Sequence, residues 1–474
     1  MPDPFDRFRL ATPRSAALFE RALRALPHGV TRDPVWREPY PLYIDHGSGA
    51  HVEDVDGRRY LDWWNNATAL VLGHADPRVV AAVGRAAERG LSFAGPTQGE
   101  IELAERLIQR LPSAERVRFT NSGSEAVMLA LQIARAVSGR PGVVKFEGAY
   151  HGGYDPVAVS VTTPIGAVGP VEAPTAAPEG TGVSRNAMRD TVVVPWNDLD
   201  AVAAVLAEHG AELGAILVEP VANKQGVLTP GPGYLEGLRR LADHHGVVLI
   251  FDEVISFRVS AGGAQAHYGV APDLTTLGKV IGGGMPVGAV AGRWDVMQHL
   301  RRGAPDGVGH MGTFNANPMT LAAGAATLEA LDDQAYAHLS SLGAYARERL
   351  RAAIAAAEVP WQVTGLASLF KVHLRARTLL RYRDTLPRPK SQELELVTRL
   401  ALAGHLMPYN AAGAVTLPMQ ARDVDALSDA LYDAAVAMRE AGTADVDAPW
   451  ASDADASVGP SPARAAERPP EHAR

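Results

Sequence analysis

Lys279 is the residue of this sequence best suited to act as a nucleophilic amine. It ends the segment 274–279, whose neighbouring residues are apolar, hydroxylic or glycine, and three glycines follow at 282–284. Such surroundings disfavour the ammonium form of a lysine, and a neutral amine can attack a carbonyl to form a Schiff base. The alternative is a lysine whose stem packs while its head reaches water. The chain has only five lysines, which are Lys145, Lys224, Lys279, Lys371 and Lys390.

A candidate phosphate site lies where Ser122, Gly123 and Ser124 follow a predicted strand and open a predicted helix. The helix is expected to run to about Ser138, with Gly139 as its stop. A glycine between hydroxyls at a helix N-terminus offers free backbone N–H groups at the positive end of the helix dipole, which suits a phosphate. The alternative is capping of the helix by Ser122 or Ser124 without a ligand.

A carboxylate and an aromatic residue also stand at predicted strand ends. Asp252 follows the apolar run 247–251, and ligands of open α/β sheets bind outside the carboxyl ends of strands. An acidic residue there can hold a protonated ring nitrogen, cap a helix or bind a metal. Tyr150 follows the run 143–146 and could present its flat face to a ring or belong to the core. A hydroxyl and amide cluster at 312–318 is a second candidate anion site.

Together these are the parts that hold pyridoxal phosphate: a phosphate cradle, a stacking aromatic, a carboxylate for a ring nitrogen and a desolvated lysine. The carboxylate would keep the pyridine nitrogen protonated, and the lysine would hold the aldehyde and later move the α-proton. Metal catalysis is disfavoured, because His151 and His244-His245 are not accompanied by a His-x-x-x-His helix or a carboxylate-rich loop.

The central part of the chain predicts the scaffold that brings these strand ends together. From about 77 to 325, helical stretches alternate with short apolar runs, as expected of a mostly parallel sheet covered by helices. The segment 162–190 is rich in Pro, Gly, Ala and Thr, and indicates a long loop over the sheet, either functional or mobile. The apolar runs are 117–120, 143–146, 215–218, 247–251 and 287–291.

The two ends of the chain predict a smaller α+β unit. A helix is expected over 14–26, ended by Pro27, and a hairpin over 48–64 with its turn at Asp56-Gly57. Further helices are expected at about 336–357, 391–405 and 422–440, with strands at about 362–374 and 407–417. We expect an N-terminal segment joining the small domain (1–75), a large cofactor-binding domain (76–325), a C-terminal small domain (326–441) and a disordered tail (442–474), whose composition cannot bury enough apolar surface.

Composition excludes several classes of protein. The 474 residues include no cysteine, which excludes a disulfide scaffold, a thiolate zinc site, an iron–sulfur cluster and a cysteine nucleophile. A net charge of -8 argues against a nucleic-acid-binding surface. There is no signal-peptide pattern and no run of about 18 apolar residues. We therefore expect a cytoplasmic protein with neither a nucleic-acid nor a membrane partner.

The motifs resemble those of the class-III (fold-type I) pyridoxal-phosphate aminotransferases, over about residues 26–438. Within that family the sequence is most similar to the branch of glutamate-1-semialdehyde aminomutase and the bacterial β-phenylalanine-type aminotransferases. The order and rough spacing of the motifs also match. The matching motifs are 121–126, Tyr150-His151-Gly152, Glu219-Pro220-Val221, 251–254, 274–279 with 282–284, and 312–315.

The resemblance implies a fold-type I α/β structure and a role for each site residue. Lys279 would form the Schiff base with the cofactor and shuttle a proton, and Asp252 would pair with the pyridinium nitrogen. The family is an obligate homodimer with shared active sites. The other cofactor-binding residues would be Tyr150 and Val254 on the two ring faces, Gly123 and Ser124 at the phosphate with Thr313 from the neighbouring subunit, and Ser122, His151 and Glu219.

Departures from the family pattern concern the substrate. Asn223-Lys224-Gln225 stand where the family usually has glycine, and Lys224 is a rival amine. Arg32 aligns with an arginine that β-amino-acid aminotransferases use for a substrate carboxylate, which a guanidinium grips in bidentate fashion; a surface salt bridge is the alternative. The segment 407–413 lacks the aminomutase glutamate and leaves a second substrate carboxylate without a partner. Trp63 and Trp64 would line the pocket or belong to the core.

We therefore expect an aminotransferase that moves an amino group between an amino acid, β-amino acids included, and a keto or aldehyde acceptor. The alternative is the intramolecular transfer of an aminomutase, which is an isomerase and needs no separate keto acid. A decarboxylase or racemase of the same fold is a further alternative. A non-catalytic relative is disfavoured, because Lys279 is intact.

Overall fold

A seven-stranded sheet forms the centre of the larger half of the molecule. The computed structural model describes residues 3–162 and 165–445. In sheet order the strands are β4 (Arg116–Thr120), β10 (Gly288–Gly292), β9 (Leu274–Gly278), β8 (Val248–Asp252), β7 (Leu213–Val218), β5 (Gly142–Phe146) and β6 (Thr191–Val194). Strands β9, β8, β7, β5 and β6 pair in parallel, and β10 runs antiparallel to both of its neighbours, so the predicted mostly parallel sheet is confirmed.

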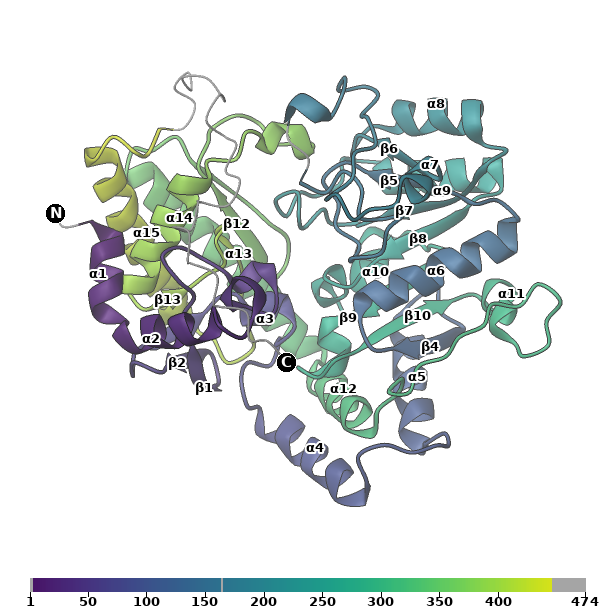
Figure 1. The fold of residues 1–474 in the computed structure, drawn as a ribbon, viewed down its shortest axis with the longest axis horizontal. Helices are drawn as coiled ribbons and strands as arrows, with labels where there is room; N and C mark the ends of the chain where they lie inside the picture. Colours follow the sequence, from purple (N-terminus) through teal and green to yellow (C-terminus); the bar gives the residue numbers. More distant parts are fainter. Residues whose placement is uncertain (1–2, 163–164, 446–474) are drawn as a thin grey trace, which may run out of the picture.

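Helices cover both faces of this sheet because its inner strands are apolar on both sides. Val248 and Ile250 of β8 pack with helix α6 (Gly123–Ser138), whereas Leu249 and Phe251 pack in a separate cluster with helices α8 (Leu199–His209) and α9 (Tyr234–His245). Alternate residues of a strand point to opposite faces, so the two clusters lie on the two sides of the sheet. Figure 1 shows these elements together in one half of the molecule.

The smaller half joins the two ends of the chain. One sheet combines three N-terminal strands with one C-terminal strand, in the order β1 (Ile44–Ser48), β2 (His51–Asp54), β3 (Arg59–Asp62) and β13 (His405–Leu406). Strand β13 pairs with β3 in parallel. A second sheet has the order β11 (Gln362–Thr364), β12 (Leu369–His373) and β14 (Ala412–Ala414). Helices α13 (Asp333–Ala356), α14 (Lys390–Leu402) and α15 (Ala421–Glu440) pack beside these sheets (Figure 1).

The remaining helices connect or flank these layers. Helix α12 (Pro318–Ala330) packs against α4 (Pro77–Arg89), α5 (Gln98–Arg110) and the short turn after β9. Within the described residues, no helix is both long and apolar enough to cross a bilayer. The helices are α1 (Pro4–Ala11), α2 (Pro13–Ala22), α3 (Asn65–Thr68), α4 (Pro77–Arg89), α5 (Gln98–Arg110), α7 (Arg185–Arg189), α10 (Gly263–Tyr268), α11 (Trp294–Met297) and α12 (Pro318–Ala330).

Several element boundaries differ from the sequence expectation. Helix α1 was not predicted. The helix expected over 14–26 is α2, which starts at Pro13 and ends at Ala22 rather than at Pro27. Strands β6 and β9 were not predicted, since β6 follows a long irregular segment and β9 lies inside the Lys279 motif. The hairpin with its turn at Asp56-Gly57 is confirmed as β2 and β3.

The start of the expected tail lies against the small half. The indole N–H of Trp361 donates to the carbonyl oxygen of Ala444 at 2.8 Å, and Ala444 is buried. The expectation of disorder for the rest of the tail concerns residues 446–474, which lie outside the described residues. The domain boundaries given above remain a prediction.

Candidate functional site

The predicted site residues meet at the carboxyl edge of the parallel strands. Asp252 is the last residue of β8, Lys279 directly follows β9, Glu219 directly follows β7, and the loop with Tyr150 and His151 follows β5. These four strands are parallel neighbours, so their carboxyl ends share one edge, where open α/β sheets bind ligands. The sequence motifs, which span more than a hundred residues, are thus brought to one place.

The Asp252 carboxylate is held by three donors. Its Oδ2 lies 2.7 Å from Nδ1 of His151, and its Oδ1 accepts hydrogen bonds from the Thr276 hydroxyl and the Val254 backbone N–H, each at 3.1 Å. Burial lowers the pKa of His151 and favours the neutral imidazole, although the charge of Asp252 opposes the shift. A neutral His151 donates its Nδ1 hydrogen to Asp252, so the carboxylate is fixed in orientation.

Lys279 stands in a strained and partly buried position. Its backbone φ is 50°, in the left-handed region that residues with a side chain rarely adopt, and such strain often occurs at functional sites. Burial lowers the pKa of its ammonium, and the carboxylates of Asp252 and Glu219 oppose that shift. The position therefore raises the fraction of neutral amine that a nucleophile or a general base needs.

Glu219 is a buried carboxyl with spare hydrogen-bonding capacity. Burial and the negative charge of Asp252 raise the pKa of Glu219 to about 8, against the opposing backbone N–H of Asn223 and the charge of Lys279. Its Oε2 atom is buried and has no hydrogen-bond partner within the described chain. A carboxyl in this state is protonated at neutral pH and can donate a hydrogen bond to a ligand.

The N-terminus of α6 closes one side of the site. The Ser122 hydroxyl accepts a hydrogen bond from the Glu125 backbone N–H at 3.2 Å, so Ser122 caps the helix. The N–H groups of Gly123 and Ser124 are in the first turn, where helices provide no internal acceptor. A Cβ on Gly123 would lie 2.9 Å from Cγ2 of Val254, so only glycine permits this approach.

The Tyr150-His151 loop lies directly against this helix end. A Cβ on Gly152 would collide with the side chain of Ser124. His151 is fully buried behind Asp252, with Nε2 unpartnered in the described chain, whereas Tyr150 is 52% exposed. These residues fit a flat cofactor: backbone donors for a phosphate, a fixed carboxylate for a ring N–H, an exposed aromatic and a desolvated amine.

Two predicted residues lie at the surface of the single chain. Thr313 is exposed and is flanked by Met311 and Phe314, which are 96% and 61% exposed. Its segment is anchored near α6, because the Asn121 amide donates to Oδ1 of Asn315 at 2.7 Å. Arg32 is exposed and makes no ion pair with a described residue. The structure therefore does not bring Arg32 or Thr313 into contact with the Lys279 and Asp252 group within one chain.

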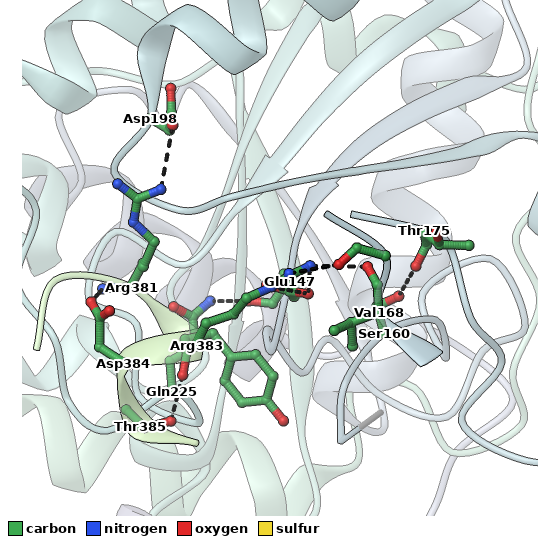
Figure 2. A network of polar contacts seen from close by, with 12 residues as sticks. Glu147, Ser160, Val168, Thr175, Asp198, Gln225, Arg381, Arg383, Asp384 and Thr385 are labelled. Carbon is green, nitrogen blue, oxygen red and sulfur yellow. Dashed lines mark hydrogen bonds and ion pairs between the residues drawn. The ribbon is translucent and has the colours of Figure 1, made fainter. Parts of the chain in front are cut away.

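A largely buried ion pair between Glu147 and Arg383 holds the start of the loop that carries Tyr150 and His151; Figure 2 shows the pair. Glu147, directly after β5, is bound in bidentate fashion by Arg383 of the short helix Tyr382–Thr385, with N–O distances of 2.9 to 3.1 Å. The same guanidinium donates to the carbonyl oxygens of Val168 and Gly169, at 2.9 and 2.8 Å. Arg383 thus ties the segment predicted as a long loop to the cofactor side of β5.

Lys145 supports the same loop from within the sheet. It is completely buried on β5, and its ammonium donates to the carbonyl oxygens of Ala149 and Val159, at 2.9 and 2.5 Å. Burial lowers its pKa to about 7. The sequence predicted Lys145 only as one of five amines, without a role. It also did not predict the roles of Thr276 and Arg383. The position of Lys145 inside an apolar strand could have predicted a structural role for this lysine. The residues around Arg383 form no pattern that predicts its pairing with Glu147.

Trp63 belongs to the core, which was the second interpretation of its motif. It is fully buried, its indole N–H donates to His405 Nδ1 at 3.2 Å, and its ring meets the edge of Phe370 at a centroid distance of 5.8 Å.

Comparisons with known proteins agree with this arrangement. The sequence profile described as aminotransferase class-III matches residues 33–390. A curated relative, glutamate-1-semialdehyde 2,1-aminomutase of Methanothermobacter thermautotrophicus, is 44% identical over 374 residues, which are 78% of this chain and 86% of the relative.

Two solved structures have the same fold. An omega-transaminase from Sphaerobacter thermophilus has a TM-score of 0.87 and 42% identity, and the match covers 90% of this chain and 98% of that one. A transaminase with PLP bound has a TM-score of 0.83 and 38% identity, with the same coverage of both chains. The fold-type I α/β architecture expected from the motifs is thereby confirmed.

Proposed function

The chain belongs to the class-III aminotransferases, and from this premise we propose that it uses pyridoxal phosphate to move an amino group on a small carboxylic substrate. The observation that carries the proposal is the convergence of Lys279, Asp252 and the N-terminus of α6 at one sheet edge. When bound, pyridoxal phosphate supplies a conjugated ring that withdraws electrons from the carbon bearing the amine.

The residues of the chain would hold that cofactor from three sides. The backbone N–H groups of Gly123 and Ser124 would bind the phosphate at the positive end of the α6 dipole. Asp252, oriented by Thr276 and His151, would accept the ring N–H. Val254, Tyr150 and Glu219 would complete the pocket, and Ser122 would act by capping α6.

Lys279 would act at its Nζ atom. Because burial lowers its pKa, a fraction of the side chain would be neutral, and Nζ would hold the cofactor at its aldehyde group and would take and return a proton at the substrate carbon. Lys224, the rival amine, is partly exposed, follows β7 rather than β9 and lies outside the matched motif.

Two reactions are compatible with this machinery. Transfer between two molecules is the reaction that the sequence favoured, and the two solved structures above are transaminases. Intramolecular transfer is supported better by the curated relatives, which bear the name glutamate-1-semialdehyde 2,1-aminomutase at 40% identity and above. We therefore place the aminomutase reaction first and retain the transaminase as the second candidate.

The requirement for a keto acid separates the two candidates. The purified holoenzyme would be given glutamate-1-semialdehyde alone, and separately an α- or β-amino acid with and without 2-oxoglutarate. Product formation from the semialdehyde alone supports the aminomutase. Turnover only in the presence of the keto acid supports the transaminase, and no amino transfer under any condition would contradict both.

We also propose that the working unit is a homodimer in which Thr313 serves the neighbouring site. Exposed apolar side chains on both sides of Thr313 support this assignment, because clustered exposed apolar residues mark interfaces. Arg32 stays a candidate for one substrate carboxylate, and its exposed guanidinium is free to take that role.

A further inference from the structure

A group of basic side chains meets at the junction between the two halves, outside the motifs described above. Lys371 lies on β12, Arg388 lies two residues before α14, and Lys224 lies in the loop after β7. Burial lowers the pKa of Lys371 to about 8, the charge of Glu393 opposes that shift, and the nearby charges of Arg388 and Lys224 add to it. The three side chains are therefore close enough to affect each other's charge.

Lys371 is the unusual member of this group. Its residue is only 3% exposed, yet its ammonium makes no hydrogen bond or ion pair with a residue in the described part of the chain. Lys145, the other deeply buried lysine, has two carbonyl partners. Nζ of Lys371 is not among the completely buried polar atoms, so the ammonium keeps a small contact with solvent. Loss of most of its hydration without a partner still costs folding free energy. The position of Lys371 therefore indicates an anionic partner that the chain itself does not supply.

The nearby groups leave the cluster with excess positive charge. Glu393 is the carboxylate that acts on both Lys371 and Tyr409, and it is already paired with Arg388. The guanidinium carbon of Arg388 lies 5.3 Å from the centroid of the Tyr409 ring, and its Nε is buried without a partner in the described chain. One carboxylate thus faces three cations, and a donor of Arg388 remains available.

The loop 222–228 connects this cluster to the candidate active site. At one end, the backbone N–H of Asn223 bonds the Glu219 carboxyl, which is close enough to Lys279 for their charges to interact. At the other end, the Gly226 carbonyl oxygen lies 3.1 Å from Nε2 of His373. His373 is two residues from Lys371 on β12, so both side chains are on the same face of that strand. Lys224 lies between these two anchor points.

We propose that Lys371, Lys224 and Arg388 bind a substrate carboxylate that is separated from the reacting carbon by a short alkyl chain. Arg388 would donate through its free Nε, and the two ammonium groups would act as point-charge donors. The cluster would provide the partner that the segment 407–413 does not supply. This assignment rests on the proposed function, since it concerns the substrate of that same site.

Glutarate, a five-carbon dicarboxylate without an amine, is the probe for this site. Its binding to the holoenzyme would be measured by titration calorimetry for the wild type, for Lys371→Met and for Lys390→Met. Lys390 is an exposed lysine at the start of α14 and serves as the matched control. We expect Lys371→Met to weaken binding by about tenfold or more, the usual effect of losing a charged hydrogen bond, and Lys390→Met to leave it unchanged.

Thermal unfolding distinguishes a loss of glutarate binding from a loss of folding in the Lys371→Met variant. Because Lys371→Met removes an unpaired buried charge, the variant should melt at or above the wild-type temperature without glutarate, and glutarate should stabilise only the wild type and the control. Equal affinity of Lys371→Met and the wild type, or a wild type that does not bind glutarate, would overturn the proposal. Inorganic phosphate bound as tightly and with the same dependence on Lys371 would overturn the assignment to a carboxylate.

The same experiment separates this proposal from the proposed function. A holoenzyme that transfers no amino group but binds glutarate through Lys371 would contradict the function and support the anion site. A holoenzyme that transfers amino groups but binds glutarate independently of Lys371 would support the function and overturn the site.

Discussion

At the scale of single residues, the hydrogen-bond partners and burial of each titratable group determine its role in the site. Asp252 is held by a hydroxyl, a backbone N–H and a neutral imidazole, whereas Oε2 of Glu219 has no partner among the described residues. Burial and the charge of Asp252 raise the pKa of Glu219 to about 8. Two carboxyls at one sheet edge thus have different hydrogen-bonding environments. The sequence predicted both as cofactor residues but could not distinguish their environments.

Thr276→Val tests the support of Asp252. The substitution keeps the shape of the side chain and removes the 3.1 Å hydrogen bond to Oδ1, which is worth about 1 kcal/mol. We expect kcat/KM to fall about fivefold and cofactor affinity to fall with it. Thr275→Val is the matched control, because Thr275 bonds Gln265 on the opposite side of β9. Its activity should stay close to wild type, and an equal loss in both variants would contradict the role of Thr276.

Glu219→Gln tests the protonation state of the buried carboxyl. Between its ordinary value of 4.5 and about 8, folded Glu219 holds a proton that the unfolded chain releases. The free energy of unfolding of the cofactor-free protein should therefore fall as pH rises through that window. Glu219→Gln cannot ionise and should show a weaker fall over the same range. Urea unfolding at several pH values would check this, and identical slopes would count against a raised pKa.

At the scale of elements, the parallel strands explain why distant motifs converge. The apolar runs at β5, β7 and β8 and the helix α6 with its stop at Gly139 could be predicted, because burial on both faces and a capped helix leave local patterns. Strand β9 and the Glu147–Arg383 ion pair could not be predicted from the sequence. The sequence of β9 is also a site motif, and the pair joins residues 236 positions apart.

Arg383→Ala should loosen the loop that carries Tyr150 and His151. The substitution leaves Glu147 buried and unpaired, which costs about 3–5 kcal/mol of stability. Hydrogen exchange in residues 147–152 and 168–175 should accelerate in parallel. Arg381→Ala is the control, because its ion pair with Asp198 is partly exposed at 3.6 Å and contributes at most about 1 kcal/mol. Comparable losses of stability in both variants would refute the importance of the Glu147 pair.

At the scale of the whole molecule, one predicted cofactor residue, Thr313, does not contact the candidate site of its own chain. Thr313 is exposed, and the neighbouring Met311 and Phe314 are unlike a monomer surface. The resemblance to class-III aminotransferases placed Thr313 at the site of the other subunit, which residue spacing alone could not indicate. A homodimer accounts for both the exposure of the residue and its place in the motif.

Mixed dimers test this arrangement. Thr313→Ala and Lys279→Ala should each be inactive or weakly active alone. In a mixed dimer, one site combines an intact Lys279 with an intact Thr313 from the other chain. Random reassociation of equal amounts makes half of the dimers mixed, each with one complete site, so about a quarter of the wild-type activity should return. No recovery after verified subunit exchange would show that Thr313 does not serve the neighbouring site.

The central claim is that Lys279 is the amine that holds pyridoxal phosphate, and the small number of lysines makes a direct measurement simple. The holoenzyme would be reduced with borohydride, which fixes the cofactor to its lysine, then digested and mapped by mass spectrometry. The chain offers five lysines. We predict that the pyridoxyl group is found on Lys279, and that Lys279→Ala carries none. A pyridoxyl group on Lys224, Lys145, Lys371 or Lys390 instead would contradict the account.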